Sequence, residues 1–247
     1  MAERFLGIPV DPVDNEGALA AARLAVAGER PPLLVIAINP EKVMKAQRDA
    51  ELRAFIERAG LRIADGVGIV LASRLRGGRV RSRVTGVDLM LLLIAEAAGL
   101  GWRVFLLGAR PEVNEAAAAE LLRRFPSLVI AGRRDGYFRP EDAGEVAAEI
   151  AKAHPDLLFV ALGSPAQERF LLQWGERTGT KVRMGVGGSL DVLAGRVPRA
   201  PTAMRRAGLE WLYRLYREPR RLRRMLVLPV FLVRAYLHRP DRAPAGR

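Results

Sequence analysis

The stretch Leu61-Arg-Ile-Ala-Asp65-Gly66-Val-Gly68 determines how we interpret the rest of the chain. Its first four residues predict a short strand, and Asp-Gly ends that strand just before an apolar run, Ile69 to Leu75, that predicts a helix. Ligands of open α/β sheets bind where the parallel strands end. We therefore expect Asp65 at the rim of a sheet, either as a catalytic carboxylate or as the N-cap of the following helix.

The same alternation of strand and helix runs through the first 195 residues. The segment Leu33–Ile38 is a continuous apolar run, which is typical of a strand buried on both faces of a parallel sheet. The other predicted strands are 5–10, 61–64, 102–107, 128–131, 157–162 and 182–186, and the predicted helices are 15–26, 40–59, 69–75, 87–98, 111–125, 140–153 and 165–177. This order predicts an α/β fold that is Rossmann-like, with a mostly parallel sheet and helices on both faces.

Three of the predicted strands end in turns that contain glycine. The turns are Gly108-Ala-Arg-Pro111, Gly163-Ser-Pro165 and Gly185-Val-Gly187-Gly188-Ser189. Glycine lets a phosphate approach the backbone and the helix N-terminus behind it, although tight turns also use glycine for conformational reasons. Because the turns line one edge of the predicted sheet, we expect a nucleotide-sized ligand there, bound by Gly108, Gly187 and Gly188. The dinucleotide fingerprint is incomplete, since Gly66-Val-Gly68 lacks its third glycine.

The positive charge is concentrated at the end of the chain. Residues 196–247 hold fourteen arginines, no lysine and three acidic residues, so they carry +11 of the formal net charge of +13. We therefore predict a catalytic core, 1–195, and a basic helical appendage, 196–247, whose end is disordered. Arginines at helical spacing beside Trp211 and Tyr216 predict an amphipathic helix that faces an anionic membrane surface or a diphosphate, or else a solvated charged face. The apolar run Met225 to Leu237 is too short to span a bilayer.

Several kinds of site are excluded by composition. The chain has no cysteine and only two histidines, which excludes a Cys/His zinc site, a disulfide framework and a cysteine nucleophile. It has no Asp-x-Asp pair to hold a divalent metal on a diphosphate, so we predict neither metal nor cofactor. The N-terminus has no apolar segment of signal-peptide length, which favours a cytoplasmic location.

Nine short motifs follow one another in an order that resembles a known family. They are Ile38-Asn-Pro40, Ala64-Asp-Gly-Val-Gly-Ile69, Arg83-Val-Thr-Gly86, Val104-Phe-Leu-Leu-Gly108, Asp135-Gly-Tyr-Phe138, Leu162-Gly-Ser-Pro-Ala-Gln167-Glu168, Gly185-Val-Gly-Gly-Ser189, Arg199-Ala-Pro201 and Gly208-Leu-Glu-Trp-Leu-Tyr-Arg214. The ordered set resembles the WecG/TagA/CpsF family of bacterial glycosyltransferases over roughly Val35 to Met225.

The resemblance implies an inverting, metal-independent transfer of a sugar, N-acetylmannosamine or a related hexose. The implied donor is a UDP-sugar, and the implied acceptor is linked to undecaprenyl diphosphate on the inner face of the cell membrane, as in wall teichoic acid synthesis. One departure is Ala37, where many members have threonine, and it leaves the donor sugar open.

The resemblance also implies roles for single residues. Asp65 matches the general base, and an inverting transfer needs only such a base and neutralisation of the departing UDP. The implied substrate-binding residues are the pocket residues Asn39, Arg83 and Gln167, the nucleotide neighbours Tyr137 and Asp191, and the acceptor-diphosphate arginines Arg214, Arg221 and Arg224.

Two other functions remain open at this point. The arginines and aromatic residues of the appendage would also suit a nucleic-acid-binding module. A nicotinamide-dependent oxidoreductase is disfavoured by the incomplete glycine fingerprint. The oligomeric state is open as well, because an appendage docked on its own core and one docked on a neighbouring subunit have the same sequence pattern.

Overall fold

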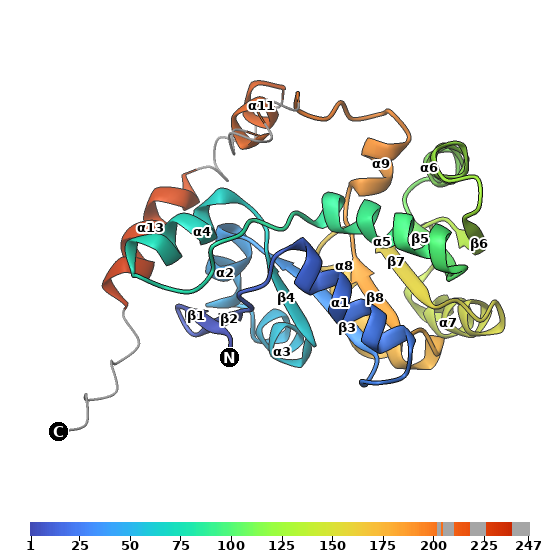
Figure 1. Cartoon of the computed structure of the whole chain (residues 1–247), viewed down its shortest axis with the longest axis horizontal. Helices are drawn as coiled ribbons and strands as arrows, with labels where there is room; N and C mark the ends of the chain where they lie inside the picture. The colour runs from blue at the N-terminus through green and yellow to red at the C-terminus, as the bar shows by residue number, and fades with distance from the viewer. Residues whose placement is uncertain (202–203, 205–209, 218–225, 239–247) are drawn as a thin grey trace.

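The computed structural model describes residues 1–201, 204, 210–217 and 226–238 (Figure 1). Within these residues, six strands form one parallel sheet in the order β4-β3-β8-β7-β5-β6. The strands are β3 (Leu33–Ile38), β4 (Leu61–Ala64), β5 (Arg103–Gly108), β6 (Val129–Arg134), β7 (Leu157–Ala161) and β8 (Val182–Gly185). The predicted α/β class and the parallel sheet are confirmed.

Helices cover both faces of the sheet, as predicted. One face carries α1 (Asn15–Val26), α5 (Gly86–Leu100), α6 (Pro111–Arg124) and α9 (Ser189–Leu193). The other carries α2 (Pro40–Ala46), α3 (Ala50–Arg58), α4 (Val67–Leu75), α7 (Ala143–Lys152) and α8 (Ala166–Trp174), with short 3₁₀ helices η1 (Pro140–Asp142) and η2 (Gly175–Thr178) beside α7 and α8.

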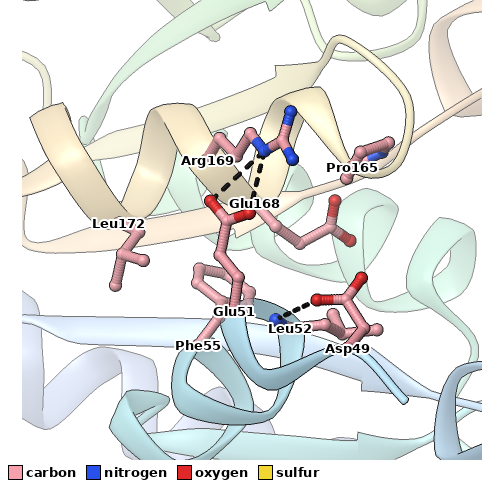
Figure 2. Close-up of a pocket in the computed structure, with 8 residues that line it drawn as sticks. All are labelled: Asp49, Glu51, Leu52, Phe55, Pro165, Glu168, Arg169 and Leu172. Atoms are coloured by element: carbon pink, nitrogen blue, oxygen red, sulfur yellow. Dashed lines mark hydrogen bonds and ion pairs between the residues drawn. The ribbon is translucent and has the colours of Figure 1, made fainter. Parts of the chain in front are cut away.

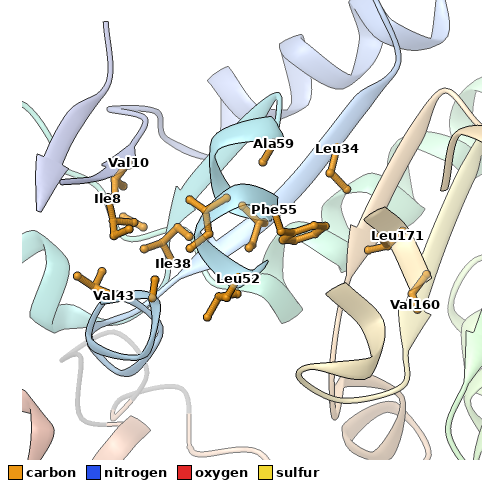
Figure 3. Packing of buried hydrophobic residues seen from close by; sticks show 14 of the residues in the cluster. Ile8, Val10, Leu34, Ile38, Val43, Leu52, Phe55, Ala59, Val160 and Leu171 are labelled. Carbon is orange, nitrogen blue, oxygen red and sulfur yellow. The ribbon is translucent and has the colours of Figure 1, made fainter. Parts of the chain in front are cut away.

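Strand β3 shows why the sheet needs both layers. Its side chains alternate between two hydrophobic clusters: Leu34, Ile36 and Ile38 face the layer of α2 and α3, whereas Leu33 and Val35 face that of α1 and α5. Figure 3 shows the first cluster, in which Leu34 and Ile38 meet Phe55 and Leu52 of α3. A strand buried on both faces has no polar side, which explains its continuous apolar sequence.

Three of the predicted elements that differ from the structure have a clear physical cause. The predicted strand 5–10 is an antiparallel hairpin of β1 (Glu3–Phe5) and β2 (Ile8–Val10), because Leu6 and Gly7 form a turn with φ of 50° and 82°. The predicted helix 40–59 is divided into α2 and α3, since Asp49 caps α3 by accepting a hydrogen bond from the Leu52 backbone. Helix α5 continues through Gly99 to Leu100, and Gly101 caps it with a φ of 71°.

The described part of the appendage contains two helices, α11 (Glu210–Arg217) and α13 (Val227–Leu237). Helix α13 packs on α2 and α4 of its own chain, with Phe231 and Ala235 fully buried and the ring of Phe231 6.2 Å from that of Phe5. None of the described helices has both the length and the apolar character needed to cross a membrane. The predicted boundary at residue 195 stays a prediction, and so does the predicted disorder at the end of the appendage, because residues 239–247 lie outside the described residues.

Candidate functional site

The carboxyl edge of the sheet brings together residues that are far apart in the sequence. Asn39 directly follows β3, Asp65 directly follows β4, and Gly187 and Gly188 follow β8. These three strands are neighbours in the order β4-β3-β8, and all run in the same direction. The ends of β7, β5 and β6 continue the same edge, which carries Gly163, Gly108 and Tyr137. We call this edge the rim.

Asp65 is fixed between a neighbouring strand end and a loop. Its backbone N–H donates to the carbonyl of Ile38 at 2.8 Å, and the preceding residue, Ala64, accepts from the Val84 N–H at 3.0 Å. The loop that carries Arg83 therefore runs beside the end of β4. The N-cap position of α4 belongs to Gly66, with φ of 95°, so Asp65 lies one residue before the cap. The rim thus holds a half-buried carboxylate beside an arginine-bearing loop.

Asn39 has a structural role at the start of α2. Its Oδ1 atom accepts a hydrogen bond of 2.8 Å from the Lys42 N–H, and Pro40 occupies the first helical position. The side-chain oxygen therefore caps the helix, and a ligand would meet the amide nitrogen.

Gln167 joins two of the turns at the rim. It is buried, and its Oε1 atom accepts a hydrogen bond of 3.0 Å from the N–H of Gly187, whose φ is 51°. Gln167 lies in the first turn of α8, which follows β7 in the sequence, whereas Gly187 follows β8. This predicted pocket residue therefore fixes the glycine turn in front of α9.

An ion pair that sequence reasoning missed connects these residues. Lys42 Nζ lies 3.0 Å from Glu168 Oε1, with only 15% and 5% of the two side chains exposed. A weak 3.5 Å contact joins the same Oε1 atom to Gln167 Nε2. The contacts therefore run from Asn39 through Lys42, Glu168 and Gln167 to Gly187. The sequence shows Glu168 beside Gln167, but no spacing pattern pairs it with a lysine 126 positions away.

A small pocket lies between α3 and α8, next to this ion pair (Figure 2). Figure 2 shows Glu168 on the side of Pro165 and Asp49, with the exposed pair of Arg169 and Glu51 beside it. The pocket has room for no more than about one water molecule, so it is too small for a sugar nucleotide.

Two aspartates at the rim form hydrogen bonds with the start of the appendage. The backbone carbonyl of Asp191 accepts hydrogen bonds from the N–H groups of Arg196 and Val197, at 2.9 and 3.2 Å. Arg199 Nη2 donates to Asp88 Oδ1, and Asp88 Oδ2 accepts from the hydroxyl of Thr85, which caps α5. Segment 196–199 is therefore held between α9, through Asp191, and the first turn of α5, through Asp88.

The ends of β5 and β6 are joined by a buried asparagine that sequence reasoning also missed. Asn114 Nδ2 donates to the carbonyls of Gly108 at 2.9 Å and Arg134 at 3.0 Å. Gly108 itself is required by close packing, because a Cβ atom there would overlap the Ala161 backbone. Beyond β6, 73% of Tyr137 is exposed, so its ring faces solvent at the rim.

The arginines predicted to hold a diphosphate are described only in part. Arg214 lies within α11, and Arg221 and Arg224 lie outside the described residues. Among the residues that are described, no three of His, Asp, Glu or Cys are grouped so that they could hold a metal ion. The metal-free mechanism stays a prediction.

Comparison with known proteins identifies a family and two similar relatives. The model of the family described as "Glycosyl transferase WecG/TagA/CpsF family" matches residues 3–244. The chain is 38% identical over 198 residues to the N-acetylglucosaminyldiphosphoundecaprenol N-acetyl-beta-D-mannosaminyltransferase of Bacillus subtilis (strain 168), which covers 80% of this chain and 77% of the relative. It is 39% identical over 211 residues to the protein of the same name from Bacillus spizizenii, covering 85% and 80%. The family match includes both the predicted core and most of the predicted appendage.

Proposed function

Because this chain belongs to the WecG/TagA/CpsF family of glycosyltransferases, we propose that it transfers N-acetylmannosamine, or a closely related hexose, from a UDP-sugar to an undecaprenyl-diphosphate-linked acceptor. Both Bacillus relatives are named for the transfer of an N-acetyl-β-D-mannosaminyl group to N-acetylglucosaminyl-diphosphoundecaprenol. This supports a role in the synthesis of a cell-wall or surface polysaccharide. Neither alternative, a nucleic-acid-binding module or a nicotinamide-dependent oxidoreductase, is supported by these relatives.

The observation that carries the mechanism is the position of Asp65 at the end of β4, between the end of β3 and the loop that bears Arg83. In an inverting transfer, Asp65 takes the proton of the acceptor hydroxyl while that oxygen attacks the anomeric carbon. The bond to UDP breaks on the opposite face, and the leaving diphosphate keeps the electron pair. Arginines and backbone N–H groups at the rim neutralise that charge without a metal.

Peripheral attachment to a membrane is supported by the outward side of α13. Leu226 at the N-cap and Val230, Val233 and Leu237 within the helix are 46% to 74% exposed, although all four are apolar. Leu71 and Leu75 on the adjacent α4 are also exposed. We call these six residues the apolar face. An exposed apolar surface beside a basic segment suits the headgroup region of an anionic bilayer, in which the lipid-linked acceptor is embedded.

A donor screen tests the proposal. The full-length protein is incubated with each of a panel of UDP-sugars and a synthetic N-acetylglucosaminyl-diphospholipid, in EDTA, and the products are analysed by mass spectrometry and NMR. We expect transfer from UDP-N-acetylmannosamine with inversion at the anomeric carbon. Transfer with retention, activity that EDTA abolishes and Mn²⁺ restores, or no transfer from any UDP-sugar would each contradict part of the proposal.

A further inference from the structure

Loop 76–85 connects α4 to α5 and carries Arg83, but it contains no helix or strand of its own. Near its end, the Val84 N–H donates to Ala64 at the end of β4, and the Val84 side chain is fully buried. Val80 is also fully buried. The short segment that contains Arg83 is therefore held at both ends, and the fixed positions of Val80 and Val84 limit where Arg83 can lie.

A single carboxylate fixes the Val80 end. Glu3 Oε2 accepts hydrogen bonds from the backbone N–H groups of Arg79 at 2.9 Å and Val80 at 3.1 Å, and from the hydroxyl of Ser73 at 2.7 Å. Hydrogen bonds to an ionised acceptor are stronger than those between neutral groups. Glu3 therefore joins the loop and the end of α4 to β1, across 70 to 77 positions of sequence.

The hairpin that carries Glu3 is itself firmly anchored. Phe5 is fully buried, and its ring contacts Phe231 of α13. The guanidinium carbon of Arg76 lies 5.3 Å from the centroid of the Phe5 ring, and Arg76 Nη1 donates to the Arg4 carbonyl at 3.1 Å. The hairpin thus packs against both the start of the loop and the appendage, and it is a fixed support for Glu3.

We propose that Glu3 is a positioning residue for sugar transfer, which holds loop 76–85 so that Arg83 lies beside the strand end that carries Asp65. The inference rests on the proposed function, in which Arg83 binds an anionic part of a substrate. Glu3 acts through the loop and does not touch the substrate.

Two variants remove the Glu3 contact in different ways. Glu3→Ala deletes the carboxylate, whereas Gly78→Ala places a Cβ atom where the Glu3 carboxylate now lies and displaces it. The Gly78 variant leaves the hairpin sequence unchanged, so it keeps the test usable if Glu3→Ala does not fold. Glu57→Gln is the control for Glu3→Ala, because it removes another carboxylate that holds the hairpin, through the exposed ion pair between Glu57 and Arg4. Gly99→Ala is the control for Gly78→Ala, because a Cβ atom added at Gly99 meets nothing within 4 Å.

Steady-state kinetics of the full chain and brief trypsin digestion provide the readouts. We expect both variants to raise KM for one of the two substrates about 10-fold with little change in kcat, because misplacing a binding group weakens binding while Asp65 is intact. We also expect faster tryptic cleavage after Arg79, Arg81 and Arg83, while both controls match the parent protein. Unchanged KM together with unchanged cleavage in both variants would overturn the inference.

A double-mutant cycle separates this inference from the proposed function. If Glu3 acts through Arg83, the variant Glu3→Ala/Arg83→Ala has the same kcat/KM as Arg83→Ala alone. If instead the two losses multiply, Glu3 does not act through Arg83 and the inference fails, while the proposed role of Arg83 stands. If Arg83→Ala alone has parent kinetics, the role of Arg83 in the proposed function fails, and the inference fails with it.

Discussion

The Nζ atom of Lys42 lies 3.0 Å from the Oε1 atom of Glu168, and this buried ion pair joins the first turn of α2 to the first turn of α8. Removing one partner of a buried pair leaves an uncompensated charge, which costs about 3 kcal/mol or more. We therefore expect Lys42→Met to lower the free energy of urea-induced unfolding by about that amount, and Lys42→Met/Glu168→Gln to recover at least about 1 kcal/mol of it.

The neighbouring pair of Arg169 and Glu51 joins α8 to α3 at the surface (Figure 2) and serves as the control. Arg169→Gln should change the unfolding free energy by less than about 1 kcal/mol, because exposed ion pairs are screened by solvent. Equal losses of unfolding free energy in Lys42→Met and Arg169→Gln would show that burial does not strengthen the Lys42 pair.

Most strands, together with Asp65 and the glycine turns, could be predicted from local sequence patterns, whereas Asn39, Gln167 and Tyr137 were implied only by the family resemblance. The apolar run of β3 and the glycine turns after β5, β7 and β8 identify strands and their ends without knowledge of the sheet order. The hairpin turn at Leu6 and Gly7 was missed because the apolar residues on its two sides form one run. The break between α2 and α3 was missed because Gln47-Arg-Asp49 contains neither proline nor glycine.

The contacts that position the rim residues could not be predicted, because they join segments that meet only in the folded chain. Lys42 and Glu168 are 126 positions apart, and Asp88 and Arg199 are 111 positions apart. Gln167 was predicted to lie in a pocket, yet its described hydrogen bond is to the backbone of Gly187. A family motif identifies such a residue but does not distinguish ligand binding from support of a turn.

Replacing the proposed base tests the chemistry directly. We expect Asp65→Asn to lower kcat by at least about 100-fold with little change in melting temperature, because the amide cannot take the proton of the acceptor hydroxyl. Asp156→Asn is the control, since Asp156 precedes β7 at the opposite edge of the sheet and accepts from the Arg103 backbone. Turnover of Asp65→Asn close to that of the Asp156 variant would remove the catalytic role.

The hydrogen bond between Gln167 and Gly187 predicts a defect in donor binding. Gln167→Met keeps the volume of the side chain but leaves the Gly187 N–H without its acceptor, so the turn in front of α9 loses its support. We expect KM for the UDP-sugar to rise about 10-fold, with a loss of about 1 kcal/mol in unfolding free energy. An unchanged donor KM alongside the stability loss would assign Gln167 to the fold alone.

The contact of Arg199 with Asp88 predicts that the start of the appendage must be fixed for activity. We expect Arg199→Met and Asp88→Asn each to lower kcat/KM for the lipid-linked acceptor about 10-fold. The double variant should be no worse than either single variant, because both substitutions remove the same contact. Arg196→Met is the control, since it removes a nearby cation but keeps the backbone hydrogen bond to Asp191. Losses that multiply in the double variant would show that the two residues act separately.

The apolar face of α13 and α4 predicts which substitutions release the protein from membranes without unfolding it. Val230 and Val233 are 46% and 59% exposed, so burial of their remaining surface in a bilayer contributes about 0.8 kcal/mol each, and Val230→Ser/Val233→Ser should weaken binding to anionic vesicles at least about 10-fold in a sedimentation assay. Transfer to a short-chain, water-soluble acceptor should be unaffected. Leu122→Ser, at a similarly exposed leucine on α6, is the control for loss of a surface apolar group. If the α13 variant binds vesicles as tightly as the Leu122 variant, the apolar face is not the membrane contact. Stronger binding of the parent protein to an oligonucleotide than to vesicles at the same salt concentration would instead favour nucleic acid as the anionic partner.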